Sequence, residues 1–166
     1  MKNLVILDGN NMIFSWKELR SSLNSKNIHQ ARKRLASRMS GYFKKYKNLH
    51  YLLVFDGKDT PGRYSLEKDS NIIFSGMKST ADEKIIQFFE EAKNNFNNII
   101  VISADKRLYS KIESFGGIAI NSRDFIKKIK LKIEFSHEPP TDLFENIYLQ
   151  QKPNKRELKQ KLLNLL

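Results

Sequence analysis

The sequence predicts an α/β protein in which a central, mostly parallel sheet is flanked by helices. Three short apolar segments, at 4–7, 50–55 and 98–102, are rich in branched side chains, as expected of strands buried on both faces. Segments with helical periodicity lie between these strands. Because strands that alternate with helices form βαβ units, we expect the strands to be parallel members of one sheet.

The first of these connections contains two predicted helices. Apolar residues at 12–16 indicate a short helix, polar residues at 21–27 a loop, and a regular apolar stripe from His29 to about Lys47 a longer helix. Arg34, Arg38 and Lys45 lie in a line beside that stripe. The line either follows the phosphate backbone of RNA or is an ordinary solvated basic face.

The middle of the chain contains a loop, a short strand and a well-marked helix start. Residues 57–64 have the glycine, proline and charged residues of a flexible loop, and 70–76 indicate a short strand at a sheet edge. Thr80 and Glu83 have the spacing of a capping box, which predicts a helix from 81 to about 95.

The remaining segments complete the predicted domain, which we place at residues 1–130. A helix at 106–115, a strand at 118–120 and a short helix beginning near Ser122 follow the third buried strand. Residues 131–135 alternate like a strand. We expect 131–166 to form a C-terminal extension whose final amphipathic helix, beginning at Pro153, either docks on the domain or binds a partner.

The composition favours a nucleic-acid partner. Thirty basic and eighteen acidic residues give a net charge of +12, as expected of a protein that binds phosphates. The absence of cysteine excludes disulfides, thiolate metal sites and a cysteine nucleophile. We see neither a signal peptide nor a membrane span, and expect no membrane partner and a cytoplasmic, organelle-matrix or stromal location. The glycine-rich loops of nucleotide-dependent motors and dinucleotide enzymes are also missing.

Acidic residues stand at the carboxyl end of each buried strand. Asp8, Asp56 and Asp105 follow the three strands, and Asp82 lies in the first turn of a predicted helix. Ligand sites of open α/β sheets lie at this edge. Each acid alone could equally be a turn or cap residue. Together, carboxylates about 4 Å apart repel by about 4 kcal/mol at an effective dielectric of 20, so the cluster should either take up protons or hold a cation.

The chemistry of this cluster points to phosphodiester hydrolysis. Oxygen ligands without cysteine or clustered histidine select Mg²⁺ or Mn²⁺, and such an ion within a basic surface activates water and offsets phosphate charge. The same pattern suggests supporting roles around the acids. Ser103, Thr80 and Glu83 would support the carboxylates or a metal-bound water, Asn10 and Asn11 would position the phosphate, and Lys58 and Arg63 would bind the flanking backbone or be plain loop charges.

Four motifs resemble a known family. Leu7-Asp8-Gly9-Asn10-Asn11 resembles the start of the NYN branch of PIN-like ribonucleases. Segments 54–57, 80–83 and 103–105 are similar to its YacP-like members in order and spacing, over residues 3–130. Asn10 stands where the family usually has Tyr, which should change the pocket wall more than the metal site.

The resemblance implies a PIN-like three-layer fold and a metal-dependent endoribonuclease. Asp8, Asp82 and Asp105 would be the metal ligands and Asp56 an additional catalytic acid, with water attack leaving a 5′-phosphate and a 3′-hydroxyl. The resemblance further implies association with ribosomes or translated mRNA. We therefore predict an enzyme that cuts single-stranded RNA. The alternatives are a catalytically inactive RNA- or ribosome-binding module and a structure-specific DNA nuclease.

Overall fold

The computed structural model describes residues 2–21, 23, 28–59, 65–66 and 69–135, and for 131–135 it describes the backbone alone. Within these residues the predicted α/β class is confirmed. Five parallel strands form one sheet in the order β3-β2-β1-β4-β5. They are β1 (Asn3–Asp8), β2 (Leu49–Phe55), β3 (Ile72–Phe74), β4 (Asn98–Ser103) and β5 (Ile118–Asn121).

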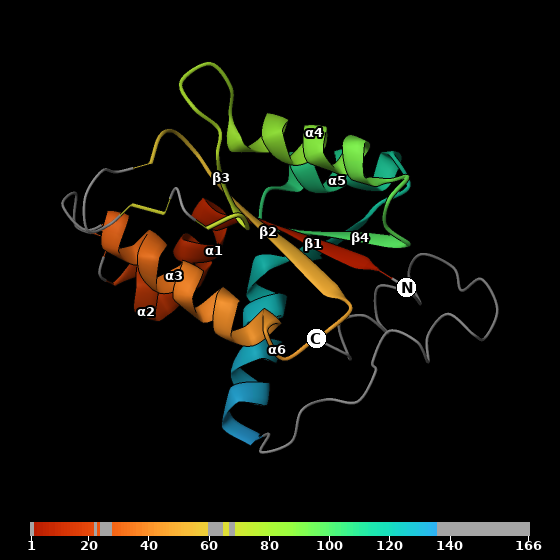
Figure 1. Ribbon diagram of the computed structural model, residues 1–166. Helices are drawn as coiled ribbons and strands as arrows, with labels where there is room; N and C mark the ends of the chain where they lie inside the picture. The colour runs from red at the N-terminus through yellow and green to blue at the C-terminus, as the bar shows by residue number, and fades with distance from the viewer. Residues whose placement is uncertain (1, 22, 24–27, 60–64, 67–68, 136–166) are drawn as a thin grey trace.

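Helices cover both faces of the sheet and make the fold three-layered (Figure 1). One face carries α1 (Gly9–Ser15), α2 (Lys17–Arg20), α3 (Ile28–Phe43) and α6 (Ser122–Phe135). The other face carries α4 (Ala81–Ala92) and α5 (Lys106–Ser114). None of the helices in the described ranges is long and apolar enough to span a membrane.

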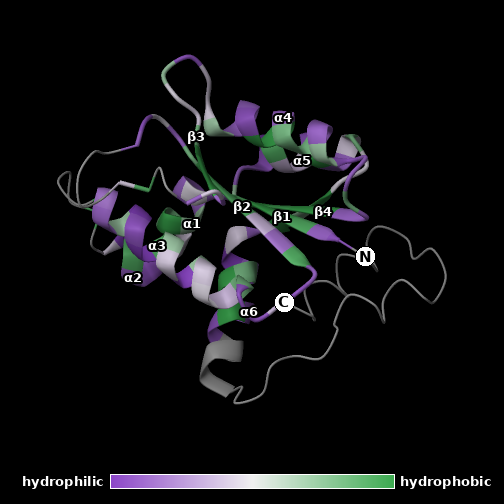
Figure 2. Cartoon of the chain, viewed as in Figure 1, coloured by the Kyte–Doolittle hydropathy of each residue, from purple (hydrophilic) through white to green (hydrophobic). Residues whose placement is uncertain are grey.

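The central strand β1 joins the two halves of the core. Its six residues are all buried, and their side chains alternate between the faces. Val5 and Leu7 belong to the hydrophobic cluster beneath α1, α3 and α6, and Leu4 and Ile6 to the cluster beneath α4 and α5. Figure 2 shows the corresponding concentration of hydrophobic residues in the central strands. A strand covered on both faces requires this apolar composition.

Most predicted elements are present with small shifts at their ends. The apolar stripe of α3 is buried as expected, but the helix ends at Phe43, so that Lys45 lies in the following turn. β3 is an edge strand, as predicted. The capping box of α4 is confirmed by reciprocal hydrogen bonds between Thr80 and Glu83.

The prediction of a strand at 131–135 is wrong, because these residues form the last part of α6. One side of this helix is buried, at Phe125, Ile126 and Ile129. Extending a helix that is already packed adds one hydrogen bond per residue, which outweighs a short alternating pattern. The expected domain boundary at 130/131 therefore falls within a helix, and the helix predicted after Pro153 lies outside the described residues.

The turn from β1 into α1 depends on a close approach at Gly9. A Cβ atom at this position would lie 2.4 Å from a ring carbon of Phe55 and 2.9 Å from the carbonyl oxygen of Val54. Neither the end of β2 nor its carbonyl can move without disturbing the sheet. Glycine thus allows α1 to begin directly against the neighbouring strand.

We expect Gly9→Ala to lower the free energy of unfolding by roughly 1–3 kcal/mol, the usual cost of overpacking a core. Urea denaturation of the purified protein measures this change. Gly41→Ala is the matched control, because a Cβ atom there meets nothing within 4 Å. In the interior of α3 that substitution should stabilise the protein by roughly 0.5–1 kcal/mol. Equal effects of the two substitutions would contradict the close-approach explanation.

Candidate functional site

The four predicted acids lie at the carboxyl edge of the sheet. Asp8 is the last residue of β1, Asp56 follows β2, Asp105 lies two residues beyond β4, and Asp82 is the second residue of α4. β1 pairs with both β2 and β4, and Leu7 is in register with Leu53 and Ile102. The register therefore brings the ends of the three strands to the same level.

Asp8 is the most buried acid, with 2% of its surface exposed. Its carboxylate accepts hydrogen bonds from the main-chain N–H of Asn11 at 3.0 Å, from the Asn11 side-chain amide, and from the Ser103 hydroxyl at 3.0 Å. Burial raises the pKa of Asp8 and these bonds oppose the rise, whereas the charge of Asp105 raises it further. Asp8 also caps the N-terminus of α1.

Ser103 connects Asp8 with Asp105. Its hydroxyl donates to Asp8 and accepts the main-chain N–H of Asp105 at 3.1 Å. Asp105 Oδ1 in turn accepts the N–H groups of Arg107 and Leu108, at 2.7 and 3.2 Å, and caps α5. A single buried serine thus links the last residue of β1 with the N-cap residue of α5.

Asp56 is held on the other side of β1. Its Oδ1 atom accepts the Ser75 hydroxyl at 3.1 Å and the main-chain N–H of Ala81 at 3.0 Å. Ser75 Oγ also accepts the N–H of Gly57 at 2.9 Å. These contacts tie the loop after β2 to the start of α4, where Asp82 lies.

The pKa of Asp82 is raised by burial and by the charges of the neighbouring acids. Burial and then the charges of Asp8, Asp105, Asp56 and Glu83 raise the pKa of Asp82 to about 6. Within the described ranges, no hydrogen bond or ion pair compensates its carboxylate. Four acids from separate elements therefore contribute to one electrostatic site.

The donor set fits a hard divalent cation. In the part of the chain that the structure describes, no three acidic or histidine side chains are close enough to form a ready metal-binding group. Asp8 and Asp105 are instead directed toward the hydrogen-bond donors of their helices. As a donor set, carboxylate oxygens without a sulfur ligand nevertheless fit a hard divalent cation better than a softer metal.

The other predicted polar residues have specific neighbours. Thr80 and Glu83 bond to each other in the capping box, and Asn11 bonds to Asp8. Asn10 differs, because its side-chain oxygen Oδ1 is buried and no described residue donates a hydrogen bond to it. Its position directly after Gly9 places it at the same strand end as Asp8.

The predicted RNA-binding residues lie mainly on and near α3. Arg34 and Arg38 are exposed on this helix, Lys45 is exposed in the turn after it, and Lys58 is exposed in the loop after β2. The Arg38 guanidinium lies 4.6 Å from the ring centroid of Trp16. Arg63 lies outside the described residues.

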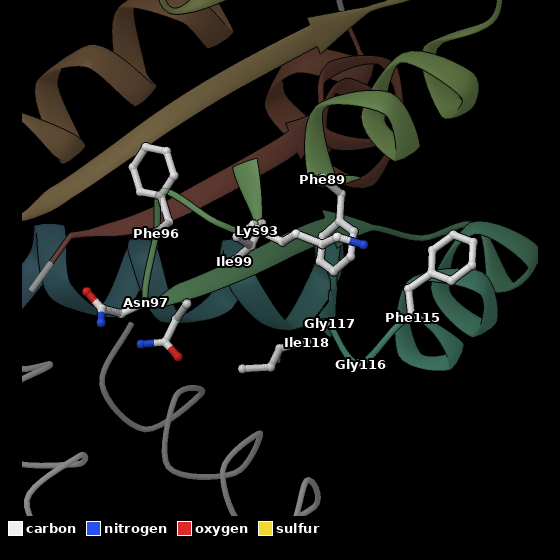
Figure 3. Close-up of a pocket in the computed structure, with 10 residues that line it drawn as sticks. Phe89, Lys93, Phe96, Asn97, Ile99, Phe115, Gly116, Gly117 and Ile118 are labelled. Atoms are coloured by element: carbon white, nitrogen blue, oxygen red, sulfur yellow. The ribbon is translucent and has the colours of Figure 1, made fainter. Parts of the chain in front are cut away.

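A cavity of about 230 Å³ lies at the opposite, amino edge of the sheet (Figure 3). Phe89, Phe96 and Phe115 contribute to its lining, together with Lys93 and the start of β5 at Ile118. A second cavity, of about 250 Å³, lies near the start of β2. Neither includes an acid of the carboxyl edge.

Two residues that contact Asp56 were missed by sequence reasoning. Ser75 bonds its carboxylate, and the Arg32 guanidinium bonds its main-chain carbonyl. Ser75 lies near the end of a short predicted strand and precedes Gly76, so a polar residue at a strand end is a weak signal that could have indicated it. The sequence gives no comparable signal for Arg32, which is simply the charged residue after Ala31 of the apolar stripe.

The chain is similar to a known protein family and to a solved structure. The family model of the YacP-like NYN domain matches residues 5–165, well past residue 130, where the resemblance seen in the motifs ended. The crystal structure of Rae1 (YacP) from Bacillus subtilis is similar with a TM-score of 0.64 and 25% identity, over 97% of this chain and 90% of that one. The crystal structure of a mutant of the same protein is similar with a TM-score of 0.62 and 23% identity, over 95% of this chain and 91% of that one. No curated protein matches the sequence.

The raised pKa of Asp82 predicts how stability depends on pH. An acid whose pKa is higher in the folded state stabilises the fold fully below its unfolded pKa of 3.8, and this contribution is lost as the pH rises through about 6. Asp82→Asn should therefore raise the free energy of unfolding by about 1 kcal/mol at about pH 8, after allowance for solvent screening, and by little at about pH 4.

Chemical denaturation of the metal-free protein at both pH values measures this difference. Asp124→Asn is the control, because Asp124 is an exposed acid in the first turn of α6. Its removal should not stabilise the protein at either pH. A native protein as stable as Asp82→Asn under the alkaline condition would contradict the crowding of acids at this edge.

Proposed function

Since the chain belongs to the YacP-like family of NYN domains, we propose that it is a metal-dependent endoribonuclease that hydrolyses phosphodiester bonds of single-stranded RNA. One observation supports this most directly. Besides burial, the charges of Asp8, Asp56 and Asp105 all raise the pKa of Asp82, which supports a shared negative site in a protein of net charge +12. Such a site repels RNA unless a cation occupies it.

Each acid has a role in this proposal. Asp8, Asp82 and Asp105 would hold Mg²⁺ or Mn²⁺, with Asp56 as a fourth carboxylate beside them. When bound, the ion would supply neutralisation of phosphate charge and activation of water. Asp82, with a pKa of about 6, is mostly ionised at neutral pH and therefore available to a cation.

The neighbouring residues would orient these acids and the substrate. Ser103 fixes Asp8 relative to the start of α5, and Asn11 fixes Asp8 from α1. Fixed carboxylates lower the cost of arranging the site during the reaction. The amide of Asn10, whose oxygen has no partner among the described residues, would orient the scissile phosphate.

The exposed basic residues would bind the RNA backbone beside the acids. Arg34, Arg38 and Lys45 form one part of this surface and Lys58 the other. Arg32 bonds the carbonyls of Asp56 and Lys58, so α3 and the loop after β2 are neighbours. Attack by water would leave a 5′-phosphate and a 3′-hydroxyl. Translated mRNA on the ribosome is the substrate we favour, on the family resemblance alone.

A catalytically inactive RNA-binding module is the second candidate. The caps that Asp8 and Asp105 provide for α1 and α5 favour it, because helix capping alone would account for two of the acids. The same basic surface would bind RNA in either case.

Asp8→Asn should separate the two functions. We expect the native protein to cut labelled single-stranded RNA in the presence of Mn²⁺, and the variant to be slower by roughly 100-fold or more, because a metal ligand is lost. Asparagine retains the helix cap, so the fold should persist. Glu91→Gln removes an exposed acid far along α4 and should leave the cleavage rate unchanged.

The remaining outcomes of this experiment identify the alternatives. Native protein that binds the RNA without cutting it would establish the inactive module. Equal or faster cleavage of matched DNA would contradict the preference for RNA.

The double variant Arg34→Gln/Lys58→Gln should weaken RNA binding without altering the acids. Each lost phosphate contact should lower the slope of log affinity against log salt by about 0.7 for a single strand. Fluorescence titrations at several salt concentrations measure the slope. An unchanged slope would exclude these two side chains from the RNA interface.

A further inference from the structure

Arg32 is only partly exposed, whereas Arg34 and Arg38 on the same helix are exposed. Its guanidinium carbon lies 5.4 Å from the ring centroid of Phe55 and 5.5 Å from that of Phe74. These phenylalanines are the last residues of β2 and β3, are in register with each other, and have their rings 5.6 Å apart. The charged group of α3 thus lies against two strand ends at the carboxyl edge.

The guanidinium uses its fork to hold the loop that follows β2. One terminal nitrogen donates to the carbonyl oxygen of Asp56 at 2.7 Å, and the other donates to that of Lys58 at 3.2 Å. Bonds from a charged donor are stronger than neutral ones, and two of them fix a direction as well as a distance. Lysine cannot reproduce this geometry, because its ammonium is a single point donor.

The loop after β2 is also held by the segment that connects β3 with α4. Gly57 has a φ of 82° and forms an antiparallel bridge with Gly76, whose φ is 81°. Ser75 and the N–H of Ala81 bond the Asp56 carboxylate. Arg32 therefore fixes the main chain of Asp56, while the start of α4 fixes its carboxylate.

An arginine at this position is less favourable than an apolar side chain of similar size, so packing alone does not explain its presence. Arg32 Nε is buried and finds no acceptor among the described residues. Burial lowers the pKa of Arg32, although the charges of Asp56 and Asp59 oppose this. A methionine would pack against the two rings without leaving a buried polar atom unpaired.

We propose that Arg32 is a positioning residue, which holds the main chain of Asp56 so that its carboxylate faces the acidic site. The effect on cleavage rests on the proposed nuclease function, whereas the effect on the loop does not. Arg32 acts through Asp56 and contacts neither RNA nor the ion.

Amide hydrogen exchange followed by NMR tests the positioning directly. In Arg32→Met, the amides of Gly57 and Ala81 should lose protection by about tenfold or more. The loop after β2 carries Gly57 itself and the Asp56 carboxylate that accepts the Ala81 amide, and this loop should open more often. The amides of Val5 and Ile6 in β1 should keep their protection. Arg32→Lys should show a similar loss, since it retains the charge without the fork. Arg20→Met, at an exposed position of α2, is the matched control and should change the protection of neither pair of amides.

Cleavage of labelled RNA with Mn²⁺ tests the consequence, at a temperature where every variant is fully folded. We expect kcat of Arg32→Met to fall by about tenfold while KM stays within about twofold, because geometry rather than binding is lost. Unchanged protection of Gly57 and Ala81 would overturn the proposal. A raised KM with native kcat would overturn it too, by making Arg32 an RNA ligand. If the native protein does not cut RNA, the nuclease function fails, and the exchange data alone decide whether Arg32 positions the loop.

Discussion

Repulsion among carboxylates at one edge of a parallel sheet is the constraint around which this structure is built. Parallel strands all end at the same side, and here the three central ones end in or just before an aspartate. Burial, and then the charges of acids from other elements, raise the pKa of Asp82. A protein with thirty basic residues could have paired these acids with lysine or arginine. The ion pairs Lys93–Glu90 and Lys130–Glu18 lie away from these acids.

The fold limits this repulsion with neutral donors rather than with cations. Asp8 accepts a hydrogen bond from Ser103, and Asp56 accepts one from Ser75. Asp105 accepts a main-chain N–H group at the start of α5. Such donors stabilise a carboxylate without cancelling its charge, so the site stays negative while each acid keeps a defined position. Asp82 alone has no such support among the described residues, which makes it the acid most responsive to a cation.

The fold and the four acids could be predicted because the signals for them are local. A buried parallel strand is a continuous apolar run, and its end is marked by the acid itself. The supports of Asp56 could not be predicted, because Ser75 and Arg32 are 19 and 24 residues away in sequence and meet it only through the pairing of β2 with β3 and the packing of α3. The last part of α6 could not be predicted for the converse reason. Its local alternation favours a strand, whereas the packed helix before it continues through these residues.

The central position of β1 also bears on how the chain acquires its structure. The strand is synthesised before both of its partners, because β2 and β4 begin at Leu49 and Asn98. A nascent chain therefore carries β1 without β2 until residues 49–55 have been made, and without its second neighbour until residues 98–103 have been made. Pairings this distant along the polymer slow folding and leave the early segment prone to aggregation or in need of a chaperone.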